Sequence, residues 1–408
     1  MSADMRQPWI HSAFVDGVFI IGTPFFVVTA TLIFSAYFGQ PDSMTFLSWA
    51  ILVMGVDVSH VYSTIYRTYL DRETMQRHGL FLFLLPFAVL IVCIVLYSFG
   101  ALVFWRVMAY VAVFHFVRQQ YGFLRVYARQ EQQNAWQRRL DAMAIYTATL
   151  YPIVDWHLAG QKNFNWFMKG DFVYLNQGGF RTAATGVFLS VITVYVAKEL
   201  YLLWKSIAAR RRSQLGKSIT TNAVPEADVP SAFNLPRNGI LLGTLLSWYV
   251  GIVHFNSDLA FTAINVMSHG IPYIALVWIY GNKKYHPLEF PLIEGTISSP
   301  PYKGGWVVAQ FFRPRYAALF VVSLFILAYA EEGLWDAWVW HNDEHHTLFA
   351  PFHAALGGAG PDSGWLKLLV PLLSVPQITH YVIDGFIWKM RRDKYGWRDI
   401  TLKPAPHS

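Results

Sequence analysis

The sequence predicts an all-α membrane protein, a polytopic helix bundle of about ten transmembrane helices with both termini in the cytoplasm. The first observation is composition: 54% of the 408 residues are hydrophobic, only 14% are charged, and the mean hydropathy is +0.32. Soluble proteins carry about 25% charged residues. The second is a series of apolar runs of about 20 residues, the length that crosses a bilayer. The third is a strict alternation of basic and non-basic loops.

Ten apolar runs are long enough to span a bilayer. They occupy residues 13–38, 45–66, 79–99, 101–126, 141–160, 183–205, 238–256, 258–281, 316–340 and 365–388. The shortest gaps, at Gly100 and at 256–257, predict tight hairpins between consecutive helices.

The loop charges predict the orientation. The N-terminus, every second loop after it and the tail together hold 25 Lys and Arg residues, whereas the opposite loops hold three. Because basic loops stay on the cytoplasmic side, both termini are expected there, in a multi-pass protein of a bacterial-type inner membrane. The net charge of +7 then indicates contact with membrane lipids and not with nucleic acid.

The whole chain, 1–408, reads as a single integral membrane domain with four segments outside the lipid. A flexible cytoplasmic linker is expected at 209–237, and a proline-rich cytoplasmic cover loop at 282–315. An outer loop is expected at 341–364, and a basic cytoplasmic tail at 389–408.

Four of the fourteen histidines fall well inside predicted spans: His60, His115, His269 and His380. Each lies on an even-numbered helix, so all four helices run in the same direction, and each lies about six to twelve residues from the inner end. At about 1.5 Å per residue the depths differ by only about 9 Å, which helix tilt absorbs. Four imidazoles are therefore expected in one layer. Ionisable groups inside membrane helices are costly, and they mark function by default.

Each of these histidines has a polar residue about one helical turn away. These residues, expected to orient the rings or to replace a ligand, are Asp57, Gln119, Asn265 and Asp384. Asp16 and His11, at the inner end of the first span, are reserve candidates.

Four imidazoles with few carboxylates predict a metal site, with iron as the first candidate and another transition metal as the second. The chain has a single cysteine, Cys93, which excludes a site built on several thiolates within one chain. The alternative interpretation is that the histidines only form hydrogen bonds between helices.

Three arginines near the inner membrane face, Arg67, Arg118 and Arg125, are candidates for holding the polar end of a substrate. Anchoring at the lipid interface would also explain them. In the outer loop the sequence HNDEHH offers His341, His345 and His346 as a possible second metal site. A polar cap is the simpler interpretation of this loop.

The arrangement of one histidine on each of several membrane helices resembles that of the bacterial membrane-embedded carotene dioxygenases of the bacteriorhodopsin-related protein family. The resemblance covers the four embedded histidines. It implies a non-haem iron that uses O2 to oxidise a lipophilic molecule such as an isoprenoid, a carotenoid or a lipid chain. Two other functions use the same groups: a proton- or ion-coupled transporter and a haem-binding electron carrier.

Overall fold

All regular secondary structure in the described part of the chain is helical. The computed structural model describes residues 7–40, 44–163, 165–217, 233–286, 306–356 and 364–388. The fold class predicted from composition and apolar runs is thereby confirmed as all-α.

In the part of the chain that the structure describes, ten long helical segments make up the bundle. Several combine α-helix with a π-helical stretch, labelled η, and the label η7 marks a short 3-10 helix. The first five are α1–η1–α2 (Ala13–Ile33), α4–η2–α5 (Phe46–Arg67), α6 (Arg72–Ser98), α7 (Ala101–Tyr127) and α8 (Ala135–Leu158). The next five are α9 (Gly178–Lys217), α10 (Leu235–Trp248) with η4 (Tyr249–His254), α11–η5–α12 (Asp258–Tyr285), η7–α14–η8 (Pro314–Trp340) and α16–α17 (Leu366–Ile387). Shorter helices are α3 (Ser35–Phe38), α13 (Trp306–Phe311) and α15 (His346–Leu356).

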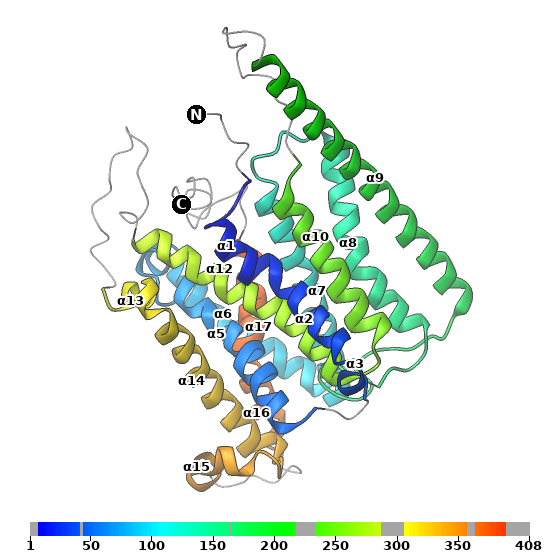
Figure 1. Ribbon diagram of the computed structural model, residues 1–408. Coiled ribbons are helices and arrows are strands. Elements are labelled where there is room, and N and C mark those ends of the chain that lie inside the picture. The colour runs from blue at the N-terminus through cyan, green and yellow to red at the C-terminus, as the bar shows by residue number, and fades with distance from the viewer. Residues whose placement is uncertain are drawn as a thin grey trace.

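The long helices run side by side between two ends of the bundle (Figure 1). One end carries α13, the start of α1 and the start of α10, and we call it the α13 end. The other carries α3 and α15, and we call it the α15 end. The segment containing α12 is the central one: 72% of its most apolar 18-residue stretch is buried, against 17% in α6 at the periphery.

Eight of the long segments are long and apolar enough to cross a membrane. The other two predicted spans, 141–160 and 238–256, fall on α8 and on α10 with η4. These two helices carry the charged residues Asp141, Asp155 and Arg237, all buried within the bundle. Charged residues lower a helix's hydropathy even when their partners lie inside the protein. The total of ten spans therefore stays a prediction.

Both predicted hairpins are present. Helices α6 and α7 are separated by two residues, and Gly100 adopts a φ of +112°, a conformation that side chains with a Cβ rarely adopt. Only residues 255–257 separate η4 from α11. Tight turns keep these consecutive helices antiparallel and in contact.

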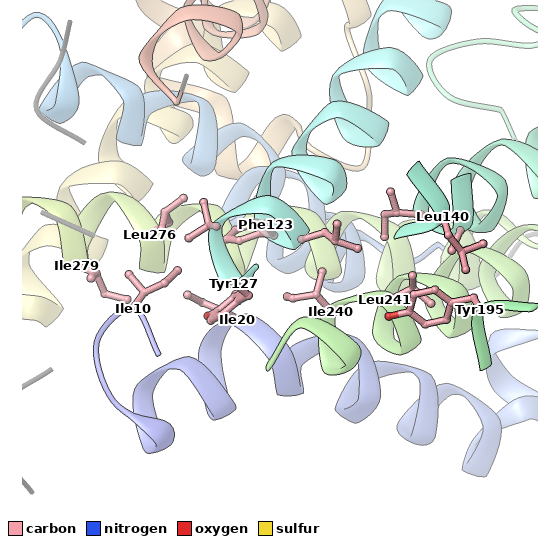
Figure 2. Close-up of a cluster of buried hydrophobic side chains, with 14 of the residues drawn as sticks. Ile10, Ile20, Phe123, Tyr127, Leu140, Tyr195, Ile240, Leu241, Leu276 and Ile279 are labelled. Atoms are coloured by element: carbon pink, nitrogen blue, oxygen red, sulfur yellow. The ribbon is translucent and has the colours of Figure 1, made fainter. Parts of the chain in front are cut away.

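A buried apolar cluster fastens the helices together at the α13 end (Figure 2). Its members come from η1, α7, α8, α9, α10 and α12, together with a residue before α1. The labelled ones are Ile10, Ile20, Phe123, Tyr127, Leu140, Tyr195, Ile240, Leu241, Leu276 and Ile279.

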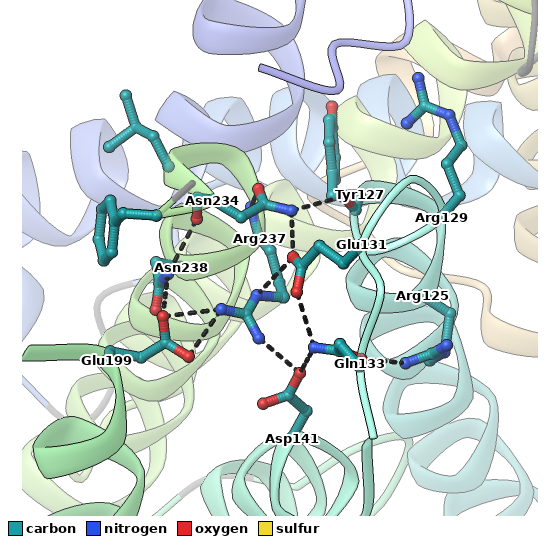
Figure 3. Close-up of polar contacts among 12 residues, drawn as sticks. Arg125, Tyr127, Arg129, Glu131, Gln133, Asp141, Glu199, Asn234, Arg237 and Asn238 are labelled. Atoms are coloured by element: carbon teal, nitrogen blue, oxygen red, sulfur yellow. Dashed lines mark hydrogen bonds and ion pairs between the residues drawn. The ribbon is translucent and has the colours of Figure 1, made fainter. Parts of the chain in front are cut away.

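An ionic cluster next to this core joins α8, α9, α10 and the loop before α8 (Figure 3). Arg237, 1% exposed, binds Asp141 at 2.5 Å, Glu199 at 2.6 Å and Glu131 at 3.1 Å. Lys198 adds ion pairs to Asp141 and Glu199. Buried charges are tolerated only when they are paired in this way.

The four segments predicted to lie outside the lipid are described in part. Helix α9 continues to Lys217, so the predicted linker 209–237 begins inside a helix, and its residues 218–232 lie outside the described part. The predicted cover loop begins within α12 and contains α13 and the start of η7, and the predicted outer loop contains α15. Residues 287–305, 357–363 and the tail 389–408 lie outside the described part.

Candidate metal centre

The four embedded histidines meet in the interior of the bundle. They come from α5 (Ser59–Arg67), α7, α12 (Met267–Tyr285) and α17 (Val375–Ile387). One ring nitrogen from each lies within 4.8 Å of the other three, and their exposed fractions are 1% for His60, His269 and His380 and 5% for His115. In the described residues this is the one group of three or more potential ligands that is compact enough for a metal ion.

Two pairs of ring nitrogens are spaced as neighbouring ligands of one ion would be. Nε2 of His269 lies 3.0 Å from Nε2 of His60, and Nε2 of His380 lies 3.2 Å from Nε2 of His115. Around a metal with bonds of about 2.1 Å, neighbouring nitrogens lie about 3.0 Å apart in a square and about 3.4 Å apart in a tetrahedron. Each distance fits an N–H···N hydrogen bond while one of the two Nε2 atoms carries a proton, and four unprotonated Nε2 atoms this close together in a dry interior fit a bound cation.

A chain of hydrogen bonds sets the tautomer of His380. Its Nδ1 lies 2.7 Å from Oγ1 of Thr64, which lies 2.8 Å from the hydroxyl of Tyr273. That tyrosine donates to Oδ1 of Asp384 at 2.5 Å. Because the last donor is fixed, the chain is complete when Nδ1 donates to Thr64 and Thr64 donates to Tyr273. Nε2 of His380 is then left with a lone pair that points into the group, as metal ligation requires.

The carboxylate of Asp384 also lies near two of the candidate ligand nitrogens. Oδ2 of Asp384 lies 3.7 Å from Nε2 of His115 and 3.8 Å from Nε2 of His380. One oxygen of Asp384 thus ends the hydrogen-bond chain, and the other faces the position between the histidines. It is placed to bind a metal ion or a group bound to one.

The rings of His60 and His269 lack the hydrogen bond through Nδ1 that holds the ring of His380. Nδ1 of His60 lies 3.6 Å from Oδ1 of Asp57, beyond ordinary hydrogen-bond length. The ring of His269 stacks on Phe116, with centroids 3.6 Å apart and planes 11° apart. Stacking fixes the plane of the ring without using either nitrogen.

Two of the predicted orienting residues form no hydrogen bond to an imidazole among the described residues. Gln119 donates to the backbone carbonyl of His269 at 3.1 Å, and Asn265 donates to the carbonyl of Phe261 at 3.2 Å. The reason for Asn265 is local: it lies in η5 (Thr262–Val266), where a wider π-helical turn changes which residues share a face.

The reserve candidates Asp16 and His11 also lie outside the group. Asp16 accepts hydrogen bonds from the backbone N–H groups of Ile10 and His11, and so fixes the chain just before α1.

The three candidate arginines differ in position. Arg67 is fully buried, with its guanidinium 3.7 Å from the ring centre of Tyr280, so it lies inside the bundle and not at a lipid-facing rim. Arg118 is exposed and donates to the hydroxyl of Tyr146, and Arg125 donates to Gln133 at 3.4 Å. Of the three, Arg118 is the most exposed, Arg125 is partly exposed and Arg67 is buried.

The outer-loop histidines do not form a second compact metal group in the described residues. His345 stacks on Trp49 with centroids 4.0 Å apart, and His346 stacks on His353. His341 lies 6.3 Å, centroid to centroid, from His353. Ring stacking accounts for this loop as a folded cap.

Sequence reasoning missed Thr64 and Tyr273. The signal was present, because Thr64 follows His60 by four residues and Tyr273 follows His269 by four, the same spacing that separates Asp384 from His380. Residues four apart share a face of an α-helix. The three polar side chains therefore form a second layer one turn nearer the α13 end, where they bond to one another.

A glycine allows the two helices of the closest histidine pair to approach. A Cβ on Gly270 would lie 2.7 Å from Cγ1 of Val56 and 3.2 Å from its carbonyl oxygen. The π-helical turn η2 (Ala50–Val58) ends two residues before His60, and η5 ends three residues before His269. Both histidines thus begin regular α-helix directly after an irregular turn, a placement that is frequent at functional sites.

Comparison with known proteins finds no match: no family model, no curated protein and no solved structure resembles this chain closely enough to be significant. The resemblance to carotene dioxygenases therefore stays an expectation from the sequence.

Proposed function

We propose that this protein is a multi-pass membrane oxidoreductase in which His60, His115, His269 and His380 hold one iron ion. In this proposal it oxidises a lipophilic molecule, such as an isoprenoid, a carotenoid or a lipid chain, with O2. The observation that carries the proposal is the convergence of four buried Nε2 atoms from four apolar helices.

The chain's own residues supply the binding and the orientation. Thr64 and Tyr273 keep the proton of His380 on Nδ1, which frees Nε2 for the metal. Asp384 accepts the hydroxyl proton of Tyr273 on one oxygen and presents the other to the site. A bound iron would supply the redox chemistry and the binding of O2. Four neutral imidazoles leave coordination positions open for that purpose.

The setting favours a lipophilic substrate. His60 lies seven residues before the end of α5, so the site is about 10 Å from that end of the helix. It is surrounded by helices whose outer faces are apolar, such as α6. In this proposal the protein lies in a bacterial-type inner membrane with both termini inside, and its substrate reaches it from the lipid.

The spacing of the ring nitrogens bears on the haem alternative. A haem held between two of these histidines needs space for a porphyrin, whereas the Nε2 atoms of the closest pairs are 3.0 and 3.2 Å apart. That spacing disfavours the electron-carrier interpretation. A transporter that uses the same groups as a relay would not need a tightly bound metal.

Metal analysis of the purified protein tests the proposal. We expect about one transition-metal ion per chain in wild type, with iron the most abundant. His269→Ala should lose the metal. His254→Ala, which removes an exposed histidine at the end of η4, should retain it. Folded wild-type protein without stoichiometric metal would contradict the proposal, and a metal-free protein that carries ions into liposomes would favour the transporter. Oxygen uptake on addition of isoprenoid or carotenoid substrates then tests the reaction.

A further inference from the structure

An acidic cavity opens at the α15 end of the bundle. Its volume is about 450 Å³, and its lining includes the acidic side chains Glu332, Asp336 and Glu344. Trp49 and Trp340 contribute aromatic walls, and the lining residues that the structure describes include no lysine or arginine. A cleft lined by charges of one sign concentrates ions of the opposite sign.

The histidine at this cavity adds no positive charge at neutral pH. His345, in the loop between η8 and α15, belongs to the lining. Burial lowers the pKa of His345 below its usual value, and the nearby carboxylates Asp336 and Glu344 only partly oppose this effect. A neutral imidazole is itself a metal ligand.

Further carboxylates continue from the cavity towards the four histidines. Glu332 lies within electrostatic range of Asp336, Glu331 and Asp57. Asp57 lies 3.6 Å from Nδ1 of His60. Trp49, on the cavity wall, precedes His60 by eleven residues, about 16 Å of helix. The carboxylates therefore occupy the interval between the cavity and the metal centre.

The carboxylate of Glu332 and Nδ1 of His60 have no hydrogen-bond partner among the described residues, whereas two other carboxylates of the series do. Glu331 accepts from the hydroxyl of Tyr62 at 2.5 Å, and Asp336 accepts from His353 at 2.8 Å. Glu332 makes neither a hydrogen bond nor an ion pair with the described residues, although it lines the cavity. At the inner end, Nδ1 of His60 is buried without a hydrogen bond of standard geometry and faces Asp57. Unsatisfied polar groups in such a place call for a ligand.

We propose that this cavity captures a divalent transition-metal ion and passes it along Glu332, Glu331 and Asp57 to the four histidines. The inference rests on the proposed function, because it requires the histidines to be a metal site. Carboxylate oxygen and neutral imidazole are ligands that such ions accept. Ionisable residues inside membrane helices line the routes of ions.

The rate of metal loading tests the route. Metal-free protein in detergent micelles is mixed with Co²⁺, and the visible absorption of cobalt bound by histidine is followed with time. Glu332→Gln keeps the size and polarity of the side chain and removes its charge. We expect it to load roughly tenfold more slowly than wild type at low ionic strength, and to reach the same final stoichiometry because the four histidines are intact. The difference should shrink at about 1 M salt, where the Debye length is about 3 Å.

Asp343→Asn is the matched control, because Asp343 is an exposed carboxylate that does not line the cavity, although it lies in the loop that carries the lining residues Glu344 and His345. It should load at the wild-type rate. A second measurement needs no variant: Gd³⁺, which binds carboxylate oxygens and not imidazole, should slow cobalt loading of wild type.

Equal loading rates for Glu332→Gln and wild type, or no effect of Gd³⁺ on wild type, would overturn the route while leaving the metal site intact. Wild-type protein that binds no Co²⁺ would instead refute the metal site itself, and the route with it.

Discussion

Replacing Thr64 with valine should weaken metal binding although Thr64 is not a ligand. The side chain is 3% exposed, and its hydroxyl connects Nδ1 of His380 to Tyr273 over distances of 2.7 and 2.8 Å. Valine has nearly the same shape but no hydroxyl. Nδ1 of His380 then has no acceptor, and nothing keeps the proton on that nitrogen in preference to Nε2.

The size of the effect follows from the lost contacts. Removing a partner that orients a metal-bound histidine typically reduces metal affinity 10- to 100-fold. That range corresponds to about 1.4 to 2.7 kcal/mol. The N–H that loses its acceptor also costs about 1 to 3 kcal/mol in the folded protein, because it is buried. We therefore expect both weaker metal binding and a lower melting temperature in Thr64→Val.

Competition with a chelator of known affinity measures the metal dissociation constant. The control is Thr31→Val, which removes a fully buried hydroxyl that bonds only to the carbonyl of Val27 in α2. It should lower stability slightly and leave metal affinity unchanged. If Thr64→Val binds metal within twofold of wild type, the hydrogen-bond chain does not set the tautomer of His380, and the reasoning is refuted.

Two further substitutions test the packing around the site. Gly270→Ala places a methyl group 2.7 Å from Val56, so it should cost about 1 to 3 kcal/mol and also weaken metal binding. Gly122→Ala in α7 is the control, because its added methyl group meets nothing within 4 Å. Equal behaviour of the two variants in thermal unfolding and metal analysis would contradict the importance of close packing at Gly270. Arg237→Met removes the cation shared by Asp141, Glu199 and Glu131 and leaves Lys198 paired with the first two only, so it should lower the free energy of unfolding by about 3 to 5 kcal/mol. Arg77→Met breaks an exposed pair, for which a loss of at most about 0.5 kcal/mol is expected, so similar losses in both variants would argue against the importance of burial.

The sequence allowed the four histidines to be selected because their depth depends only on helix rise and helix direction. Counting residues from the inner ends of four helices placed His60 and His380 in one layer without any knowledge of neighbours. The all-helical class followed equally directly from the apolar runs.

The partners of the rings were harder to predict, because the choice between upstream and downstream neighbours depends on local helix geometry. Asn265 was expected upstream of His269, but it lies in a π-helical turn and bonds to its own helix. Tyr273, downstream in regular α-helix, lies on the face that the spacing predicts. A sequence does not mark where a helix widens by one residue.

The acidic cavity could not be predicted at all, because its walls come from segments far apart in the chain. Thr45 and Glu332 both line it, although 287 residues separate them in sequence. Their proximity results from packing between α14–η8 and α4–η2, which the sequence does not record.

The π-helical turn η2 divides one membrane helix into two halves. The direction in which the side chains of one half point around the helix axis can differ from that of the other half. Trp49, on the cavity wall, precedes this turn, and His60, in the metal centre, follows it. Each residue added to or removed from a helix rotates what lies beyond it by about 100°. Deleting one residue within η2 would therefore turn Trp49 to another face while His60 keeps its direction. The half that faces the cavity can change its contacts during evolution without moving the half that holds the metal ligand.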